Sequence, residues 1–151
     1  MRNFSVNSFL FVLALMCFGV HSSAQGSLNS DESRTLAIAV VKLKMESEGY
    51  TLFSDDAFTL IQDNSKYKSM TVRSGRTYVF INVPTEDGFQ DSDIYLREMD
   101  ETLIAKDADD SPVSLVKYYC SISREIKAWV KNYSSTRSSY PYDTRLLVFY
   151  K

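Results

Sequence analysis

Aspartates offer the clearest chemistry in this chain. Those that crowd one stretch are Asp91, Asp93, Asp107, Asp109 and Asp110. A tight turn at Asp100-Glu101 predicts a hairpin whose open end gathers these carboxylates. Ca²⁺ takes about six to eight oxygen ligands from carboxylates and loop carbonyls, so a calcium site is one hypothesis. A solvated acidic rim, with Lys106 and Arg97 as partial counter-charges, is the other.

The single tryptophan, Trp129, is the second candidate. Alternation over 122–133 places it on a strand face that otherwise carries lysines and a tyrosine. An exposed aromatic ring gives a flat apolar contact surface for a sugar or a protein at little entropic cost. The alternative is that the N-terminal helix covers Trp129 while the flanking lysines extend outward to water. The candidate ligand-binding residues are Trp129, Tyr133, Tyr140 and Tyr142.

The inventory of catalytic side chains is short. The only histidine is His21, and the only cysteines are Cys17 and Cys120. If the first 24 residues are a cleaved leader, a Ser-His-Asp triad, a Cys-His pair and a His/Cys zinc site are excluded. The glycines are isolated, so no phosphate-binding loop is expected. A glycosidase with two carboxylates stays formally open, but nothing singles out two acids, and we expect a protein that is not an enzyme.

Residues 1–24 have the layout of a secretory signal peptide. Arg2 gives a positive start, an apolar run covers 9–20, and Ala24 precedes a cleavage site with small residues. A membrane span needs about twenty apolar residues, more than this run provides. We expect cleavage after Ala24, a flexible stretch at 25–30, and a periplasmic or secreted product. The remaining Cys120 is then either buried or paired between chains.

Length and charge narrow the function further. The chain has 151 residues, with 17 Lys and Arg against 19 Asp and Glu. That length predicts one domain, which we place at 31–151. The slight negative charge gives no basic footprint for nucleic acid. After cleavage, no later segment is long and apolar enough to span a membrane.

One helix and many strands are expected in that domain. The range 31–48 is rich in helix formers, with Leu36, Val40 and Leu43 on one face and Gly49 as the stop. From Tyr50 onward, β-branched and aromatic runs alternate with turn signals and no helix intervenes, which predicts an antiparallel sandwich or barrel. The expected strands are 50–54, 57–62, 66–73, 76–84, 92–98, 101–107, 113–119, 122–133 and 142–150.

The second half of the chain carries a recognisable series of short segments. They are Gly75-Arg-Thr-Tyr-Val-Phe80, Asp91-Ser-Asp-Ile-Tyr-Leu96, Leu103-Ile-Ala-Lys-Asp-Ala-Asp-Asp-Ser-Pro112, Ile126-Lys-Ala-Trp-Val-Lys-Asn-Tyr133 and Leu146-Leu-Val-Phe-Tyr-Lys151. Over about residues 66–151, the chain resembles the bacterial pre-peptidase C-terminal domain and its secreted relatives. The resemblance implies a jelly-roll-like β-sandwich. Some members hold calcium at acidic loops, and Asp91, Asp93, Asp107 and Asp109 match those acidic positions.

Two departures limit what the resemblance implies. The family often has a glycine-rich turn before its penultimate strand, whereas residues 119–125 contain no glycine. Its members usually follow a secreted enzyme, and no enzyme domain is present here. The sequence therefore predicts an exported accessory or binding module for carbohydrate or protein, with calcium as a candidate cofactor. The alternative is a periplasmic or envelope structural or inhibitor-like protein with no small ligand.

Overall fold

The described residues form a β-sandwich with one helix on its side. The computed structural model describes residues 30–107 and 109–151, with side chains from Thr35 onward. The predicted signal peptide and nearly all of the stretch 25–30 lie outside these residues. The elements are α2 (Ser30–Ser47), β1 (Thr51–Leu60), β2 (Ser65–Val72), β3 (Arg76–Pro84), β4 (Phe89–Glu98), β5 (Leu103–Asp107), β6 (Ser114–Cys120), β7 (Arg124–Ser135) and β8 (Tyr142–Tyr150).

The strands form two antiparallel sheets of four. The first sheet has the order β1-β8-β3-β6, and the second has the order β2-β7-β4-β5. Strands from the two halves of the chain pair as β1 with β8, β2 with β7, β3 with β6 and β4 with β5. This nested pairing, closed by β3 with β8 and β4 with β7, is the jelly-roll arrangement. The mainly β, jelly-roll-like sandwich expected from the sequence is confirmed.

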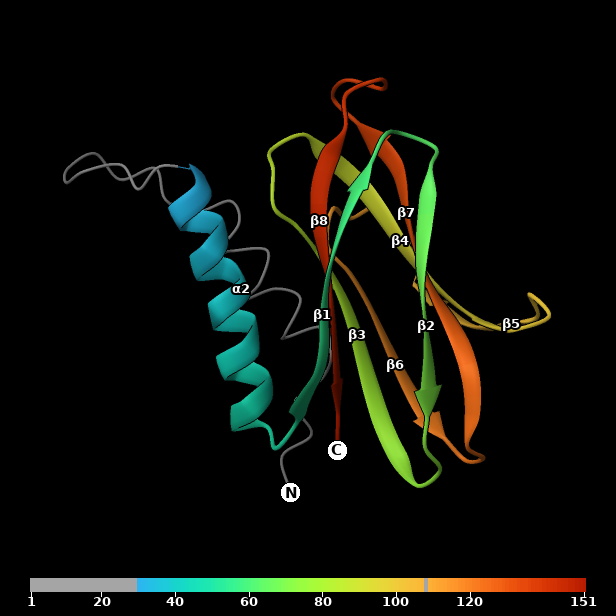
Figure 1. Ribbon diagram of the computed structural model, residues 1–151. Helices are drawn as coiled ribbons and strands as arrows, with labels where there is room; N and C mark the ends of the chain where they lie inside the picture. The colour runs from blue at the N-terminus through green and yellow to red at the C-terminus, as the bar shows by residue number, and fades with distance from the viewer. Residues whose placement is uncertain (1–29, 108) are drawn as a thin grey trace.

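Two apolar layers hold the sandwich together. Between the sheets, fully buried side chains of β3, β4, β7 and β8 interlock, among them Phe80, Ile94 and Leu146. Outside the first sheet, Val41 and Met45 of α2 pack with buried side chains such as Ile81 and Phe149. Figure 1 shows α2 standing beside β1 and β8, on the far side of the molecule from β2 and β7. The described helix is not long and apolar enough to cross a membrane.

The buried face of α2 differs from the expected one. Leu36 and Leu43 are 54% and 65% exposed, whereas Val41 and Met45 face the first sheet. The helix is apolar on both faces, so periodicity alone does not choose between them. Lys42, next to Val41 in sequence, forms a 2.7 Å ion pair with Asp55 on the outer face of β1. The ion pair and the apolar contacts of Val41 and Met45 go with the same orientation of the helix.

Two further expectations are settled by packing. The predicted strands 50–54 and 57–62 form the single strand β1, which pairs with β8 across the intervening residues; Asp55 there binds Lys42 and Arg145. Cys120 is completely buried, and its thiol lies 3.2 Å from the carbonyl oxygen of Ile122. Burial of this thiol favours the first of the two alternatives, a core cysteine that acts as a small hydrophobe.

Candidate functional site

The outer face of the second sheet carries a row of aromatic side chains. Ile94 and Val130 point into the sandwich, so Tyr95 and Trp129, their neighbours in β4 and β7, point out of it. Strand register places Tyr67 of β2 directly opposite Trp129, and Trp129 directly opposite Tyr95. We call Tyr67, Trp129 and Tyr95 the aromatic row. It crosses three of the four strands of this sheet.

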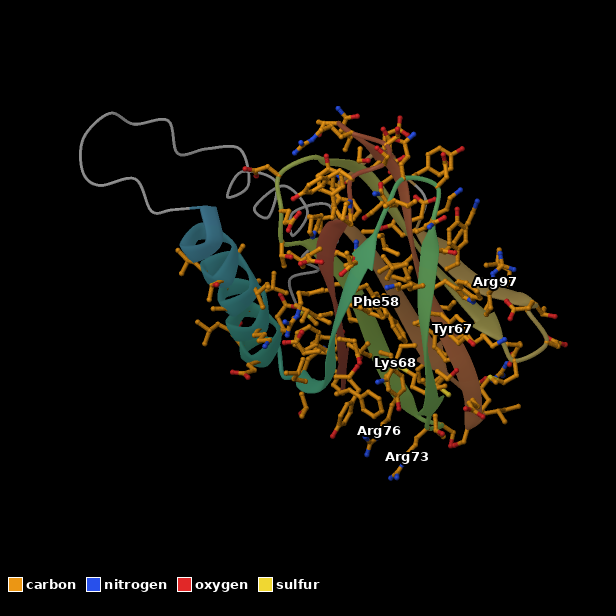
Figure 2. The ribbon with its side chains drawn as sticks, turned by 45° about the horizontal axis from the view of Figure 1, so that its top comes forward. Phe58, Tyr67, Lys68, Arg73, Arg76 and Arg97 are labelled. Carbon is orange, nitrogen blue, oxygen red and sulfur yellow. The ribbon has the colours of Figure 1, made fainter. Side chains whose placement is uncertain are left out.

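The rings of the aromatic row are partly open to solvent. The Tyr67 and Trp129 ring centroids are 4.5 Å apart at an interplanar angle of 41°, close enough to stabilise each other. Tyr67 is 47% exposed, and Trp129 is half-buried. The indole Nε1 of Trp129 is buried without a hydrogen-bond partner among the described residues. Figure 2 shows Tyr67 on the side of the molecule away from α2.

Cationic side chains flank the rings. The Lys127 ammonium lies 5.4 Å from the Tyr67 ring centroid, and the Arg97 guanidinium lies 5.7 Å from that of Tyr95. The same geometry recurs on β7, where the Lys131 ammonium lies 4.3 Å from the ring of Tyr133. A cation over an aromatic ring is attracted to it and fixes its orientation. The row is therefore held in place by Lys127 and Arg97.

The same two cations connect the row to the turn of the β4–β5 hairpin. Lys127 forms an ion pair with the Glu101 carboxylate and donates a 3.3 Å hydrogen bond to the carbonyl oxygen of Met99. Arg97 donates a 2.8 Å hydrogen bond to the carbonyl oxygen of Glu101. The aromatic row and the hairpin turn are consequently parts of one continuous surface.

The predicted acidic residues border this surface at the other end of β4. The Tyr95 hydroxyl donates a 2.6 Å hydrogen bond to Asp93, and burial together with this carboxylate raises the pKa of Tyr95 to about 12. Burial raises the pKa of Asp91, and the neighbouring carboxylates of Asp93 and Asp110 raise it further. Burial also raises the pKa of Asp107, and Asp109 adds to the effect. These aspartates are therefore near enough to repel one another.

The acidic group has its own internal contacts. Asp107 accepts a hydrogen bond from the backbone N–H of Leu115, and Asp91 has one buried oxygen without a partner in the described part of the chain. Within the described ranges, no group of three or more His, Cys, Asp and Glu side chains is arranged to hold a metal ion. The calcium site stays a prediction.

The other predicted aromatic residues are divided between the two sheets. Trp129 and Tyr133 belong to β7, and the alternative in which α2 covers Trp129 is wrong because the helix packs on the first sheet. Tyr142 belongs to β8, is buried beside Phe89, and has no ring surface to offer a ligand. Tyr140 lies in the β7–β8 connection and is partly exposed. Its ring packs against that of Tyr142, with the two ring centroids 4.8 Å apart.

Two residues of the aromatic row were not predicted as site residues. Tyr67 and Tyr95 join Trp129 only through the register of three strands that are not adjacent in sequence. The alternation of β4 places Tyr95 on the polar face, which is a signal, but the sequence does not show which strand lies beside it. Nothing in the sequence indicates that Glu101 pairs with Lys127, because the two residues are 26 positions apart.

Comparisons with known proteins add little to this description. The sequence matches no model of a known protein family, and no curated protein matches it. The resemblance to the pre-peptidase C-terminal domain is therefore unconfirmed. The structure is similar to the crystal structure of Aeromonas hydrophila PliG, a periplasmic lysozyme inhibitor of g-type lysozyme, with a TM-score of 0.45 and 13% identity over 68% of this chain and 86% of that one. A likeness this distant does not bear on function.

Proposed function

We propose that the chain is an exported, non-catalytic protein that binds another protein through the outer face of its second sheet. The observation that carries the proposal is the aromatic row, which joins partly exposed rings into one surface bordered by Arg97 and Lys127. Tyrosine, tryptophan and arginine are the side chains that contribute most at protein interfaces. A partner would cover the rings and remove their apolar surface from water.

A carbohydrate ligand is the second candidate. The indole Nε1 of Trp129 is buried without a hydrogen-bond partner among the described residues, and a sugar hydroxyl could pair with it if the ring shifts on binding. Aromatic rings also stack on the apolar faces of sugars. Protein is preferred because the surface continues into the exposed apolar side chains of Met99 and Leu103 on the hairpin, which offer no groups for a sugar.

The test compares the two faces of the molecule. The purified protein is immobilised and exposed to the extracytoplasmic protein fraction of its source, and in parallel to a glycan array. The variants are Tyr67→Ser and Trp129→Leu. Their matched control is Tyr119→Ser, because Tyr119 is also an exposed tyrosine but lies on β6 of the first sheet. Circular dichroism verifies that each variant is folded.

The proposal expects a retained protein whose binding falls at least tenfold in Tyr67→Ser and Trp129→Leu and is unchanged in Tyr119→Ser. Equal losses in all three variants, or no loss in the first two, would overturn it. Glycan binding that depends on Tyr67, without a retained protein, would replace protein by carbohydrate as the partner class.

A further inference from the structure

The β4–β5 hairpin turn is the most prominent projection of the second sheet. Figure 1 shows β5 and the turn extending sideways, away from the rest of the sandwich. The turn spans 99–102, and the exposed fractions of Met99 and Leu103 on its two sides are 46% and 47%. Two apolar side chains at the end of a projection do not contribute to the core. A contact with a partner would remove this apolar surface from water.

The turn is held rigidly, although it lies far from the core. Lys127 binds both the Glu101 carboxylate and the Met99 carbonyl oxygen, and Arg97 binds the Glu101 carbonyl oxygen. The Asp100 carboxylate accepts a 3.0 Å hydrogen bond from the backbone N–H of Thr102. These contacts fix the backbone on both sides of the exposed Met99 side chain.

Glu101 occupies a backbone conformation that favours glycine. Its φ is +72°, in the left-handed region, which glutamate rarely adopts. A glycine there would relieve the strain but would lose the carboxylate that binds Lys127. The side chain of Lys127 is only 14% exposed, so this ion pair is partly shielded from water. The turn thus keeps a strained residue whose side chain locks its shape, as is common at binding sites.

The charge of the turn indicates the chemistry of its partner. Asp100 is an exposed acid beside the two apolar side chains, and among the described residues its carboxylate forms no ion pair, whereas that of Glu101 is paired with Lys127. The hydrogen bonds from Thr102 lower the pKa of Asp100 below its usual range. A complementary surface has a basic group beside an apolar centre, because opposite charges at the rim steer association and exclude wrong partners.

We propose that the hairpin turn is the anchor of the interface, and that Met99 and Leu103 enter an apolar pocket on a partner protein whose rim carries a basic group facing Asp100. This inference rests on the proposed function and specifies the kind of partner it requires. Lys127 acts as a positioning residue, since it contacts the turn and not the pocket. A turn already held in its bound shape loses little conformational entropy on binding, and affinity rises accordingly.

The experiment uses the immobilised protein and the same extracytoplasmic protein fraction as the probe. The anchor variant is Met99→Ser/Leu103→Ser, and its matched control is Ile122→Ser, an exposed apolar side chain in the turn between β6 and β7. Asp100→Asn tests the charge while keeping an oxygen that accepts from Thr102.

Lys127 needs a readout of its own. Lys127→Met should increase hydrogen exchange of the amides at 99–102 and weaken retention, and Lys127→Arg should restore both. A purely structural role would instead lower global stability without a local change in exchange. If Lys127→Met speeds hydrogen exchange at 99–102 but still binds the partner as well as the unaltered protein does, Lys127 has no positioning role.

The outcomes separate this inference from the proposed function. The inference expects at least a tenfold loss in the anchor variant, none in Ile122→Ser, and a severalfold loss in Asp100→Asn that disappears at high salt. Full retention by the anchor variant together with a loss in Tyr67→Ser overturns the inference and leaves the proposed function standing. If the unaltered protein retains nothing, both proposals fall.

Discussion

At the scale of single residues, Gly88 shows how closely one backbone position can be constrained. Its φ is +120°, and a Cβ atom placed there would lie 2.4 Å from Cε1 of the buried Tyr142. Gly88→Ala therefore combines backbone strain with a clash in the core, and we expect a loss of about 2–4 kcal/mol in the free energy of unfolding. Urea denaturation measures it. Gly75→Ala is the control, because its Cβ meets nothing within 4 Å at a similarly positive φ, and a loss as large there would refute the clash.

Asp91 gives a prediction about pH. Burial and neighbouring carboxylates raise its pKa in the folded state, so the folded protein binds a proton more readily than the unfolded chain does. Its destabilising effect is absent below the unfolded pKa, near 4, and grows as pH rises through the folded pKa. In EDTA at pH 7, Asp91→Asn should raise the free energy of unfolding by about 0.5 kcal/mol, and at pH 3 it should change nothing.

The same variant tests the calcium hypothesis. A cation among the aspartates would offset their repulsion, so added CaCl₂ should raise the melting temperature of the unaltered protein more than that of Asp91→Asn. No shift in either protein would leave these carboxylates as a solvated acidic rim. A lower stability of Asp91→Asn at pH 7 in EDTA would contradict the repulsion itself.

At the scale of elements, one carboxylate connects α2 to the first sheet. Asp55 on β1 binds Lys42 of the helix and Arg145 of β8, each at 2.7 Å. Burial opposes ionisation of Asp55, but the hydrogen bonds from these two cations outweigh it and lower its pKa. The stabilisation is therefore present above the unfolded pKa near 4 and is lost as pH falls through the folded pKa.

Asp55→Asn should cost about 1–2 kcal/mol at pH 7 and far less at pH 3, because the amide carries no charge for Lys42 and Arg145. Thermal denaturation at the two values of pH tests this, and hydrogen exchange should show faster exchange in α2. The matched control is Glu48→Gln, which removes the exposed pair of Glu48 with Lys44 and should cost at most a few tenths of a kcal/mol. Equal effects of the two substitutions would contradict the special role of Asp55.

The helix also shows what periodicity can and cannot predict about an element. Its range was predictable to within one residue at each end, because helix formers and Gly49 define it locally. Its buried face was not, because Leu36 and Leu43 form as regular a stripe as Val41 and Met45 do. The contacts with the first sheet make the choice, and the ion pair of Lys42 with Asp55 on β1 is one of them. Long-range charge pairs are invisible to local patterns.

At the scale of the whole molecule, the sandwich was predictable and the candidate site only in part. Alternation and turn signals define the strands locally, and strands without helices between them leave a sandwich or a barrel. The aromatic row depends instead on a jelly-roll register that brings Tyr67, Trp129 and Tyr95 together from separate strands. The acidic group was easier to predict, because the β4–β5 hairpin that gathers it is local in sequence.

A buried polar network around Asn82 connects the two sheets, and we expect it to specify their alignment. The side-chain Nδ2 of Asn82 donates a 2.9 Å hydrogen bond to the Ser92 hydroxyl of β4. Its side-chain Oδ1 accepts a 2.6 Å hydrogen bond from the Thr144 hydroxyl of β8. All three side chains are fully buried. Ser92 in turn donates to the carbonyl oxygen of Pro112 at 2.8 Å. The network thus joins β3 and β8 of the first sheet to β4 of the second. Apolar contacts alone would allow many relative positions of the two sheets, whereas these directional hydrogen bonds allow few.

Asn82→Ala should lower the free energy of unfolding by about 2–4 kcal/mol, because it leaves the Thr144 hydroxyl buried without its acceptor and opens a cavity. Asn82→Leu/Thr144→Val should recover part of that loss, since both polar partners are replaced together. It should nevertheless broaden the near-ultraviolet circular dichroism and raise dye binding, as a core with an apolar but less specific packing does. Asn64→Ala, at an exposed asparagine before β2, should change neither quantity. A loss under about 1 kcal/mol in Asn82→Ala would show that the apolar layers alone set the register of the two sheets.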